Sequence, residues 1–463
     1  MNKVSLSFAA ARSTRQRSSS RPNRTQRIAS ACLAAVLLAG CSTPAFNPNQ
    51  EAPAPTDGAT PSAAGPTTPV APQPTLVPDP QKLAAKLKTV SRAGIGAGGV
   101  TVLADDGAVL ASRSPDKAVA PASTMKVLTT LAAVDLLGPD HRFTTRVVGA
   151  GSGRIVLVGG GDPLLTVKPS TSVNKPASLT ALAQATAATL TASGVTQVSL
   201  AYDASLFTGA AYSPRWKAIW SSYTARVSAL VVGSGMANKW QASTKPALTA
   251  AKAFAAQLKA AGIKVKLTGA AKAPADASEL ASVQSAPLST IVGRTLRVSD
   301  NLAAEVLARH IAIASGQPAT FDGGAQATQK WLADHGLWAD GMRLLDGSGL
   351  ARDARVTPTV LARAIQLSLN TERLYSITQG LPVAGKNGTL KDRFDDKSEK
   401  VARGNVRAKT GTLRGVAALA GYLTTADGAR LAFALMATNT AGQTTAYNWL
   451  DRSAAAMVRC GCT

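Results

Sequence analysis

Apolar residues recur at helical spacing in several stretches of the chain. The stretches QKLAAKLKTVS (81–91) and PLSTIVGRTLRVSDNLAAEVLARHIA (287–312) have this pattern. So do ASLTALAQATAATLTASG (177–194) and ALTAAKAFAAQLKAAG (247–262). A period near 3.6 residues predicts helices with one buried face. A further apolar run follows "PAS" at residues 121–123, and it predicts a helix that Ser123 opens.

Other stretches read as short strands separated by turns. The segment GGVTVLADDGAVLASRS (98–114) predicts two strands joined by an Asp-Asp-Gly turn, and residues 143–165 predict two more. Residues 405–440 contain apolar runs that predict an antiparallel meander, and residues 263–271 predict a further strand after a helix.

The N-terminal region differs from the rest in composition. A basic segment precedes an apolar run at residues 28–40, which is the length of a signal-peptide core, so we expect residues 1–40 to be a signal peptide. Leu38-Ala39-Gly40-Cys41 resembles the bacterial lipobox, and Cys41 is therefore the expected lipidation site. Ordinary cleavage nearby and an uncleaved signal anchor are the competing interpretations. Residues 41–80 are rich in Pro, Ala and Thr and contain no Lys or Arg, which predicts a disordered tether.

The charge and aromatic content of the chain argue against nucleic-acid binding. The chain of 463 residues has 50 Lys and Arg against 26 Asp and Glu. Seven of the basic residues precede Cys41, and the others occur singly, with few aromatic residues for base stacking. We therefore expect no nucleic-acid partner and a surface suited to an anionic cell envelope.

Histidine and cysteine usage excludes two kinds of site. The three histidines have no His or Cys neighbour at ligand spacing, so we expect no metal and no other cofactor; they are His141, His310 and His335. The same scarcity argues against a Ser-His-Asp hydrolase. Cys460 and Cys462 end an exported chain, and we expect a local disulfide between them that closes too short a loop to stabilise the fold much.

Three short motifs carry candidate chemistry. Ser123-x-x-Lys126 stands at a helix start, where a serine nucleophile with a lysine base is one interpretation and a helix cap with a solvated lysine is the other. Ser299-Asp300-Asn301 interrupts a helical stretch, and Lys409-Thr410-Gly411-Thr412 stands on a predicted strand. Each motif alone has an ordinary structural explanation. Their occurrence together, in this order, favours a catalytic site.

This constellation resembles the active-site serine penicillin-binding proteins and serine β-lactamases. The chain is similar in particular to class C low-molecular-mass penicillin-binding proteins, which are D-alanyl-D-alanine carboxypeptidases/endopeptidases of the DacB type. Further resemblance lies in VGGGDPLL (158–165), LLDGSGLARDARVTP (344–358) and LPVAGKNGTLKDRF (381–394), and in the long insertion between the first two motifs. The likeness covers roughly residues 81–463.

The resemblance implies an α+β protein with a serine β-lactamase/penicillin-binding transpeptidase-like fold and an inserted domain, in which helices flank an antiparallel five-stranded sheet. Residues 81–165 and 286–463 would form the penicillin-binding catalytic domain, and residues 166–285 the inserted domain. The 176 positions between Ser123 and Ser299 are fewer than expected for the longest family members, so we expect one inserted domain.

The resemblance also implies roles for the motif residues. Ser123 would attack the carbonyl of the penultimate D-Ala, with Lys126 as base and Ser299 as a proton relay to the leaving amine. Asn301 would hold the substrate amide. The terminal carboxylate would bind at Lys409, Thr410 and Thr412, while Gly411 lets the ligand approach the strand. The backbone N–H groups of Ser123 and Thr412 would form the oxyanion hole.

We therefore expect a serine-type D-Ala-D-Ala carboxypeptidase, with endopeptidase activity possible, that acts on peptidoglycan stem peptides. β-Lactam antibiotics would be covalent inhibitors. The protein would be exported to the outer face of the cytoplasmic membrane or the cell wall, held by a lipid anchor. Two alternatives are a serine β-lactamase and a non-catalytic wall-binding or penicillin-sensing protein. The long gap after the first motif argues against a β-lactamase. The intact motif residues argue against a non-catalytic protein.

Overall fold

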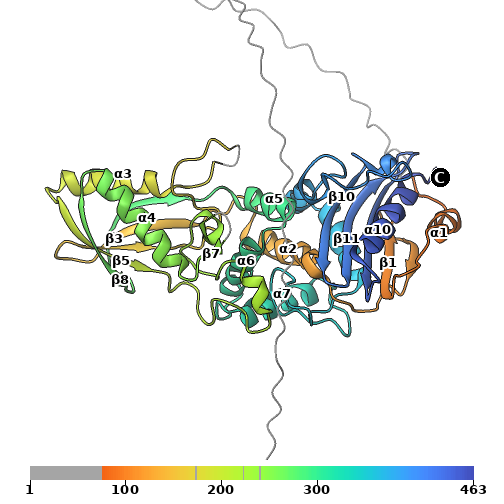
Figure 1. The fold of residues 1–463 in the computed structure, drawn as a ribbon, viewed down its shortest axis with the longest axis horizontal. Coiled ribbons are helices and arrows are strands. Elements are labelled where there is room, and N and C mark those ends of the chain that lie inside the picture. The colour runs from red at the N-terminus through yellow and green to blue at the C-terminus, as the bar shows by residue number, and fades with distance from the viewer. Residues whose placement is uncertain (1–75, 173–174, 223, 239–240) are drawn as a thin grey trace, which may run out of the picture. The chain divides into compact units, whose positions relative to one another are not determined.

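The computed structural model describes residues 76–172, 175–222, 224–238 and 241–463. The predicted signal peptide, Cys41 and nearly all of the predicted tether therefore lie outside the described residues. The described residues belong to one compact unit (Figure 1). Among the described residues no helix is long and apolar enough to cross a membrane.

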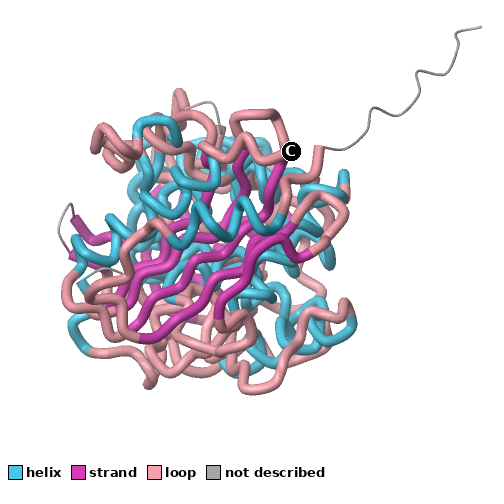
Figure 2. The backbone as a smooth tube through the Cα atoms, turned by 90° about the vertical axis from the view of Figure 1, so that its right-hand side faces the viewer, coloured by secondary structure: helices cyan, strands magenta, loops and turns pink. Residues whose placement is uncertain are grey.

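The predicted antiparallel five-stranded sheet is present and is called the first sheet here. Its strand order is β10-β11-β12-β1-β2, with every neighbouring pair antiparallel. The meander β10–β12 thus continues into the N-terminal hairpin β1–β2, and Figure 2 shows the strands side by side. The strands are β1 (Ala97–Leu103), β2 (Val109–Arg113), β10 (Val406–Leu413), β11 (Val416–Thr424) and β12 (Arg430–Thr438).

Helices cover both faces of the first sheet. Successive side chains along each strand point to opposite faces, so each strand contributes apolar side chains to both. Phe433 and Leu435 face a core shared with α1 (Pro80–Lys88) and α10 (Gln443–Val458). Ala432, Ala434 and Met436 face a core shared with α2 (Met125–Leu137) and α8 (Pro358–Asn370). The small side chains of Ala432 and Ala434 on this second face leave room for α2, which carries Lys126, to pack against the sheet. The remaining helices of this part are α5 (Leu288–Val298), α6 (Asn301–Ala314), α7 (Phe321–Asp334) and α9 (Tyr375–Gly380).

A second five-stranded sheet is built from the middle of the chain. Its order is β8-β5-β4-β3-β9, with β8, β5 and β4 parallel and β3 antiparallel to both β4 and β9. Two helices share an apolar core with this sheet. The elements are β3 (Thr144–Gly149), β4 (Arg154–Val158), α3 (Leu179–Ala192), β5 (Gln197–Asp203), α4 (Pro246–Ala260), β8 (Lys264–Ala270) and β9 (Glu279–Gln284), and a short hairpin of β6 (Met236–Asn238) and β7 (Gln241–Ala242) lies between β5 and α4.

The boundary of the inserted segment differs from the sequence-based expectation. Residues 143–165 were assigned with the first sheet, but β3 and β4 pair with β5 and β9 in the second sheet. The alternation of apolar residues determines which face of a strand is buried and says nothing about which strand lies beside it. That the second sheet is an independent domain stays a prediction.

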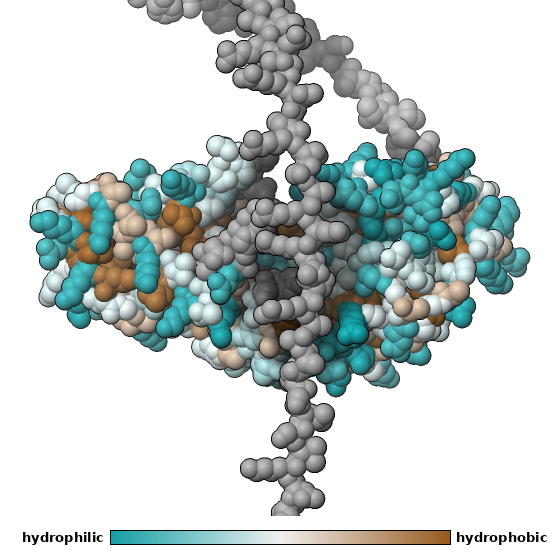
Figure 3. All heavy atoms as spheres, viewed as in Figure 1, coloured by the Kyte–Doolittle hydropathy of each residue, from teal (hydrophilic) through white to brown (hydrophobic). Residues whose placement is uncertain are grey.

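Several predicted local features are confirmed. Helices lie where the spacing placed them, at α1, α3 and α4, and the helical stretch 287–312 forms α5 and α6 with a break at Ser299 and Asp300. A disulfide joins Cys460 and Cys462, whose side chains are buried against the α1–α10 core. Hydrophilic residues predominate on the surface over β10, β11 and α10, whereas apolar residues are visible among them over α3 and α4 (Figure 3).

Candidate active site

The serine of the first motif lies on a tight turn that leads into α2. Residues Ala122–Thr124 form a 3-10 turn, and Ala122 has a φ of 47°, an uncommon backbone conformation for a residue with a side chain. Thr124 Oγ1 closes the turn by donating a 2.7 Å hydrogen bond to the carbonyl of Pro121. The turn holds Ser123 at the N-terminal end of α2.

Two glycines leave room for this turn. A Cβ at Gly349 would lie 1.9 Å from the carbonyl oxygen of Ala122, and one at Gly411 would lie 2.6 Å from that of Pro121. The sequence-based role for Gly411 was the approach of a ligand to the strand. The close approach observed at this glycine is made by the chain's own turn, so Gly411 sets the separation between β10 and Ser123.

Lys126 lies one helical turn after Ser123 and is completely buried. Its Nζ donates hydrogen bonds to Ser123 Oγ at 2.9 Å, Asn301 Oδ1 at 2.8 Å and the carbonyl oxygen of Ser348 at 2.8 Å. Three acceptors around one ammonium group satisfy all of its donors. The first motif is therefore a connected buried network, and the solvated-lysine interpretation of Lys126 is wrong.

Burial lowers the pKa of Lys126 to about 8. The carboxylates of Glu305, Asp346 and Asp300 act in the opposite direction and hold the pKa up. Lys409 is the second buried lysine of the site, and its pKa is lowered well below its ordinary value by burial first and by Lys126 second.

The second and third motifs meet at Ser299. This residue ends α5 with a left-handed backbone, φ 59°, because the chain turns there before Asp300 caps α6. Lys409 is a residue of β10 and is fully buried, and its Nζ donates hydrogen bonds to Ser299 Oγ at 3.0 Å and to the carbonyl oxygen of Thr410 at 2.7 Å. Asn301 is the first residue of α6, and from this position its Oδ1 accepts the hydrogen bond from Lys126 Nζ.

A cleft of about 300 Å³ opens above these groups. It is lined by Ser123, Ser299, Thr389, Arg393, Thr410, Thr412 and Tyr447. The lining contains hydroxyl groups and one guanidinium and no histidine or carboxylate. Among the described residues no cluster of three or more His, Cys, Asp or Glu side chains could hold a metal ion.

Three residues of the cleft wall were missed by sequence reasoning. Thr389 Oγ1 lies 2.8 Å from Thr410 Oγ1, and Tyr447 Oη lies 2.9 Å from Thr412 Oγ1. Arg393 stacks on the ring of Tyr447 at 4.2 Å and forms a salt bridge to Asp451. Thr389 and Arg393 belong to the stretch 381–394, whose resemblance was noted without roles. Tyr447 on α10 gave no signal in the sequence.

A buried pair of carboxyl groups supports the lysine from below, and it was also missed. Glu305, 1% exposed, accepts hydrogen bonds from the backbone N–H groups of Gly347 at 3.0 Å and Ser348 at 2.7 Å. Asp346 accepts from the N–H groups of Gly349 and Ala351 and from Trp216 Nε1, each at 2.7 Å. Burial, and then the neighbouring Asp346, raises the pKa of Glu305 to about 7.

Comparison with known proteins supplies the family. The sequence profile of the D-Ala-D-Ala carboxypeptidase 3 (S13) family matches residues 81–239 and 236–457. The chain belongs to this family. The prediction of a serine-type carboxypeptidase is thereby confirmed at the level of the family, as is the resemblance to DacB-type proteins.

Individual proteins that are similar to this chain support the same family assignment. The chain is 34% identical over 422 residues to a carboxypeptidase of Mycobacterium tuberculosis, covering 88% of this chain and 86% of the relative. It is 34% identical over 373 residues to carboxypeptidase DacB of Mycolicibacterium smegmatis, covering 78% and 79%. The fold is similar to that of penicillin-binding protein 4 (DacB) from Haemophilus influenzae, with a TM-score of 0.65 at 21% identity, covering 79% of this chain and 97% of that one. The predicted penicillin-binding fold is thereby confirmed.

Proposed function

We propose that this S13 family member is a serine DD-peptidase that removes the terminal D-Ala from peptidoglycan stem peptides through an acyl-enzyme. The observation that carries the proposal is the 2.9 Å contact between Ser123 Oγ and the buried Nζ of Lys126. A pKa of about 8 leaves roughly a tenth of Lys126 neutral at pH 7, and the neutral amine accepts the serine proton.

In the acylation step the Ser123 Oγ bonds to the carbonyl carbon of the penultimate D-Ala, and the C–N bond to the last D-Ala breaks. The serine proton passes to Lys126 and then, through Ser299, to the leaving amine. Water then hydrolyses the ester, with Lys126 as base. Backbone N–H groups of Ser123 and Thr412 stabilise the oxyanion in both steps.

The residues of the cleft wall determine how the substrate binds. The terminal carboxylate binds the hydroxyl groups of Thr410 and Thr412 in the positive field of Lys409, and Asn301 holds the peptide amide. Arg393, which is held by its salt bridge to Asp451, adds a guanidinium group to the lining of this wall. The edge of β10 beyond Ala408 allows the peptide to add as a strand, since β10 is at the end of the sheet order and its first residues, 406–408, bond to residues 382–384.

Labelling with a fluorescent penicillin tests the nucleophile. The β-lactam amide resembles D-Ala-D-Ala, so the wild-type protein should become covalently labelled on Ser123, as peptide mapping would show. Ser123→Ala should not be labelled, whereas Ser193→Ala, at an exposed serine of the second-sheet region, should label normally. Covalent label on another serine of Ser123→Ala would show that the nucleophile is wrongly assigned.

Product analysis separates the alternatives. Incubation with an N-acylated peptide ending in D-Ala-D-Ala should release free D-Ala, and a cross-linked dimer would reveal endopeptidase activity. Rapid hydrolysis of penicillin without D-Ala release would favour a serine β-lactamase. Stable penicillin labelling with no D-Ala release from any peptide would favour a penicillin-sensing protein.

The proposed location is the outer face of the cytoplasmic membrane or the cell wall, with a lipid on Cys41. Its support is the lipobox-like Leu38–Cys41 and the tether that follows it. These segments are the part of the proposal that rests on the sequence alone.

A further inference from the structure

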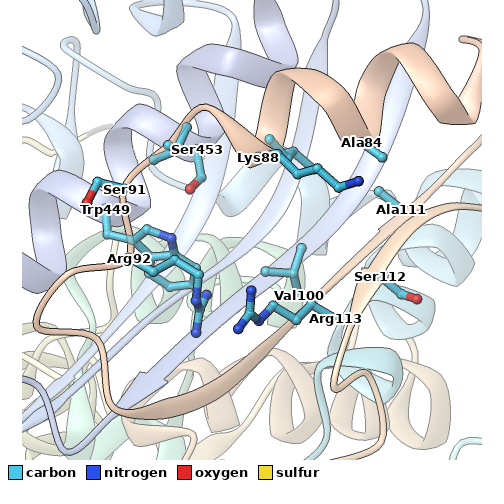
Figure 4. A pocket seen from close by; sticks show the side chains of 12 residues that line it. Ala84, Lys88, Ser91, Arg92, Val100, Ala111, Ser112, Arg113, Trp449 and Ser453 are labelled. Carbon is cyan, nitrogen blue, oxygen red and sulfur yellow. The ribbon is translucent and has the colours of Figure 1, made fainter.

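A second cavity, of about 480 Å³, lies between α1, α10 and the β1–β2 hairpin (Figure 4). Its apolar wall includes Val100, Ala111 and Trp449, and two arginines, Arg92 and Arg113, point into it. Its volume is that of a pocket for a small organic molecule.

This cavity is separate from the catalytic cleft. It lies at the β2 edge of the first sheet, whereas the cleft borders β10 at the opposite edge. The two share no lining residue. A molecule bound in the second cavity would therefore not touch Ser123 or its partners.

Positive charge in the cavity is uncompensated. Lys88, Arg92 and Arg113 all line it, and none of the ion pairs found among the described residues involves them. Lys88 and Arg113 are exposed at the rim, while Arg92 is half-buried and packs on the Trp449 ring, with Cζ 4.7 Å from the ring centroid. Like charges gathered without a carboxylate cost free energy unless an anion joins them.

Arg92 is the centre of this cluster. Burial, and then the charge of Arg113, lowers its pKa. Its Nη1 is shielded from water and has no hydrogen-bond partner among the described residues. A buried charged donor without an acceptor is costly, and an oxyanion in the cavity between Arg92 and Arg113 would offset this cost through its negative charge.

We propose that this cavity is a non-catalytic site for an oxyanion carried on a small apolar body. The arginine pair binds the oxyanion, as carboxylate and phosphate both bind guanidinium groups side-on, and the Trp449–Val100 wall accepts the apolar part. The carboxylate of a wall peptide and the phosphate ester of an envelope polymer or lipid share this chemistry.

Calorimetric titration of the full chain tests the site. The probes are phenyl phosphate, benzoate and inorganic phosphate at constant ionic strength. Phenyl phosphate or benzoate should bind one molecule per chain, and Arg92→Gln and Arg113→Gln should each weaken binding about ten-fold or more, as loss of a charge-assisted hydrogen bond predicts. Arg113 is exposed, so that variant should remain folded. Preference between the two organic probes identifies phosphate or carboxylate as the natural group.

Two controls locate the binding. Arg154→Gln, at an exposed arginine of the second sheet, should bind as the wild type does, and so should Thr412→Ala, which removes a hydroxyl group from the proposed carboxylate site of the catalytic cleft. The proposal fails if neither organic probe saturates, or if both arginine variants bind normally. Loss of binding in Thr412→Ala would place the anion in the catalytic cleft and also overturn it. Inorganic phosphate binding as tightly as phenyl phosphate would remove the role of the apolar wall. These outcomes do not depend on penicillin labelling or D-Ala release.

Discussion

Replacing Glu305 by Gln should move the pH dependence of acylation to lower pH. Glu305 is the first of three carboxylates that hold the pKa of Lys126 up against burial. Removing its charge destabilises the ammonium form, so Lys126 loses its proton at lower pH. A neighbouring buried charge shifts a pKa by roughly one unit, which would move the midpoint from about 8 to roughly 7.

The same substitution should cost some stability. The carboxylate of Glu305 accepts two backbone N–H groups, and a glutamine amide offers one oxygen to them and turns its NH₂ toward the other. One buried N–H without an acceptor costs about 1–3 kcal/mol. Because Ser348 also supplies the carbonyl that binds Lys126, the maximum rate at high pH should fall as well.

The assay is the second-order rate of penicillin acylation between pH 5 and 10, with urea unfolding measured on the same samples. Glu399→Gln is the control, since Glu399 also has little exposed surface but lies beside Arg452, 3.4 Å away, and is not among the groups that shift the pKa of Lys126. Its acylation midpoint should stay near the wild-type value. A Glu305→Gln midpoint that stays in place or rises, in a folded protein, would refute the electrostatic reasoning.

Three other outcomes are expected. Lys126→Arg should acylate at least a hundred-fold more slowly at every pH because a guanidinium stays protonated, while Lys409→Arg should be milder; a near wild-type rate in Lys126→Arg would remove lysine from the mechanism. Gly411→Ala should slow acylation about ten-fold or more, since its Cβ would meet the Pro121 carbonyl and displace the Ser123 turn; an unchanged rate would show that the turn adapts freely. Cys41→Ala should release the protein from the membrane fraction, and unchanged retention would favour an uncleaved anchor.

The sequence alone determined the local elements and the identity of the motif residues. Helical spacing placed α1, α3 and α4, and short apolar runs placed the meander β10–β12. These are local signals, because the period of apolar residues follows from the geometry of a single element. The three motifs were recognisable for a similar reason, since each has fixed spacing within one short segment. Together they indicated the family that the comparisons confirm.

Only the tertiary structure shows the features that are formed by segments distant from one another in the chain. The pairing of β3 with β9 assigned residues 143–165 to the second sheet, which no periodicity reveals. The support of Lys126 by Ser348 and Glu305 joins three separate segments, and so does the cavity around Arg92. The set of charged groups that determines the pKa of Lys126 was likewise beyond the sequence. Burial lowers it and three carboxylates oppose that effect, and both depend on which groups the fold brings within a few ångströms of one nitrogen.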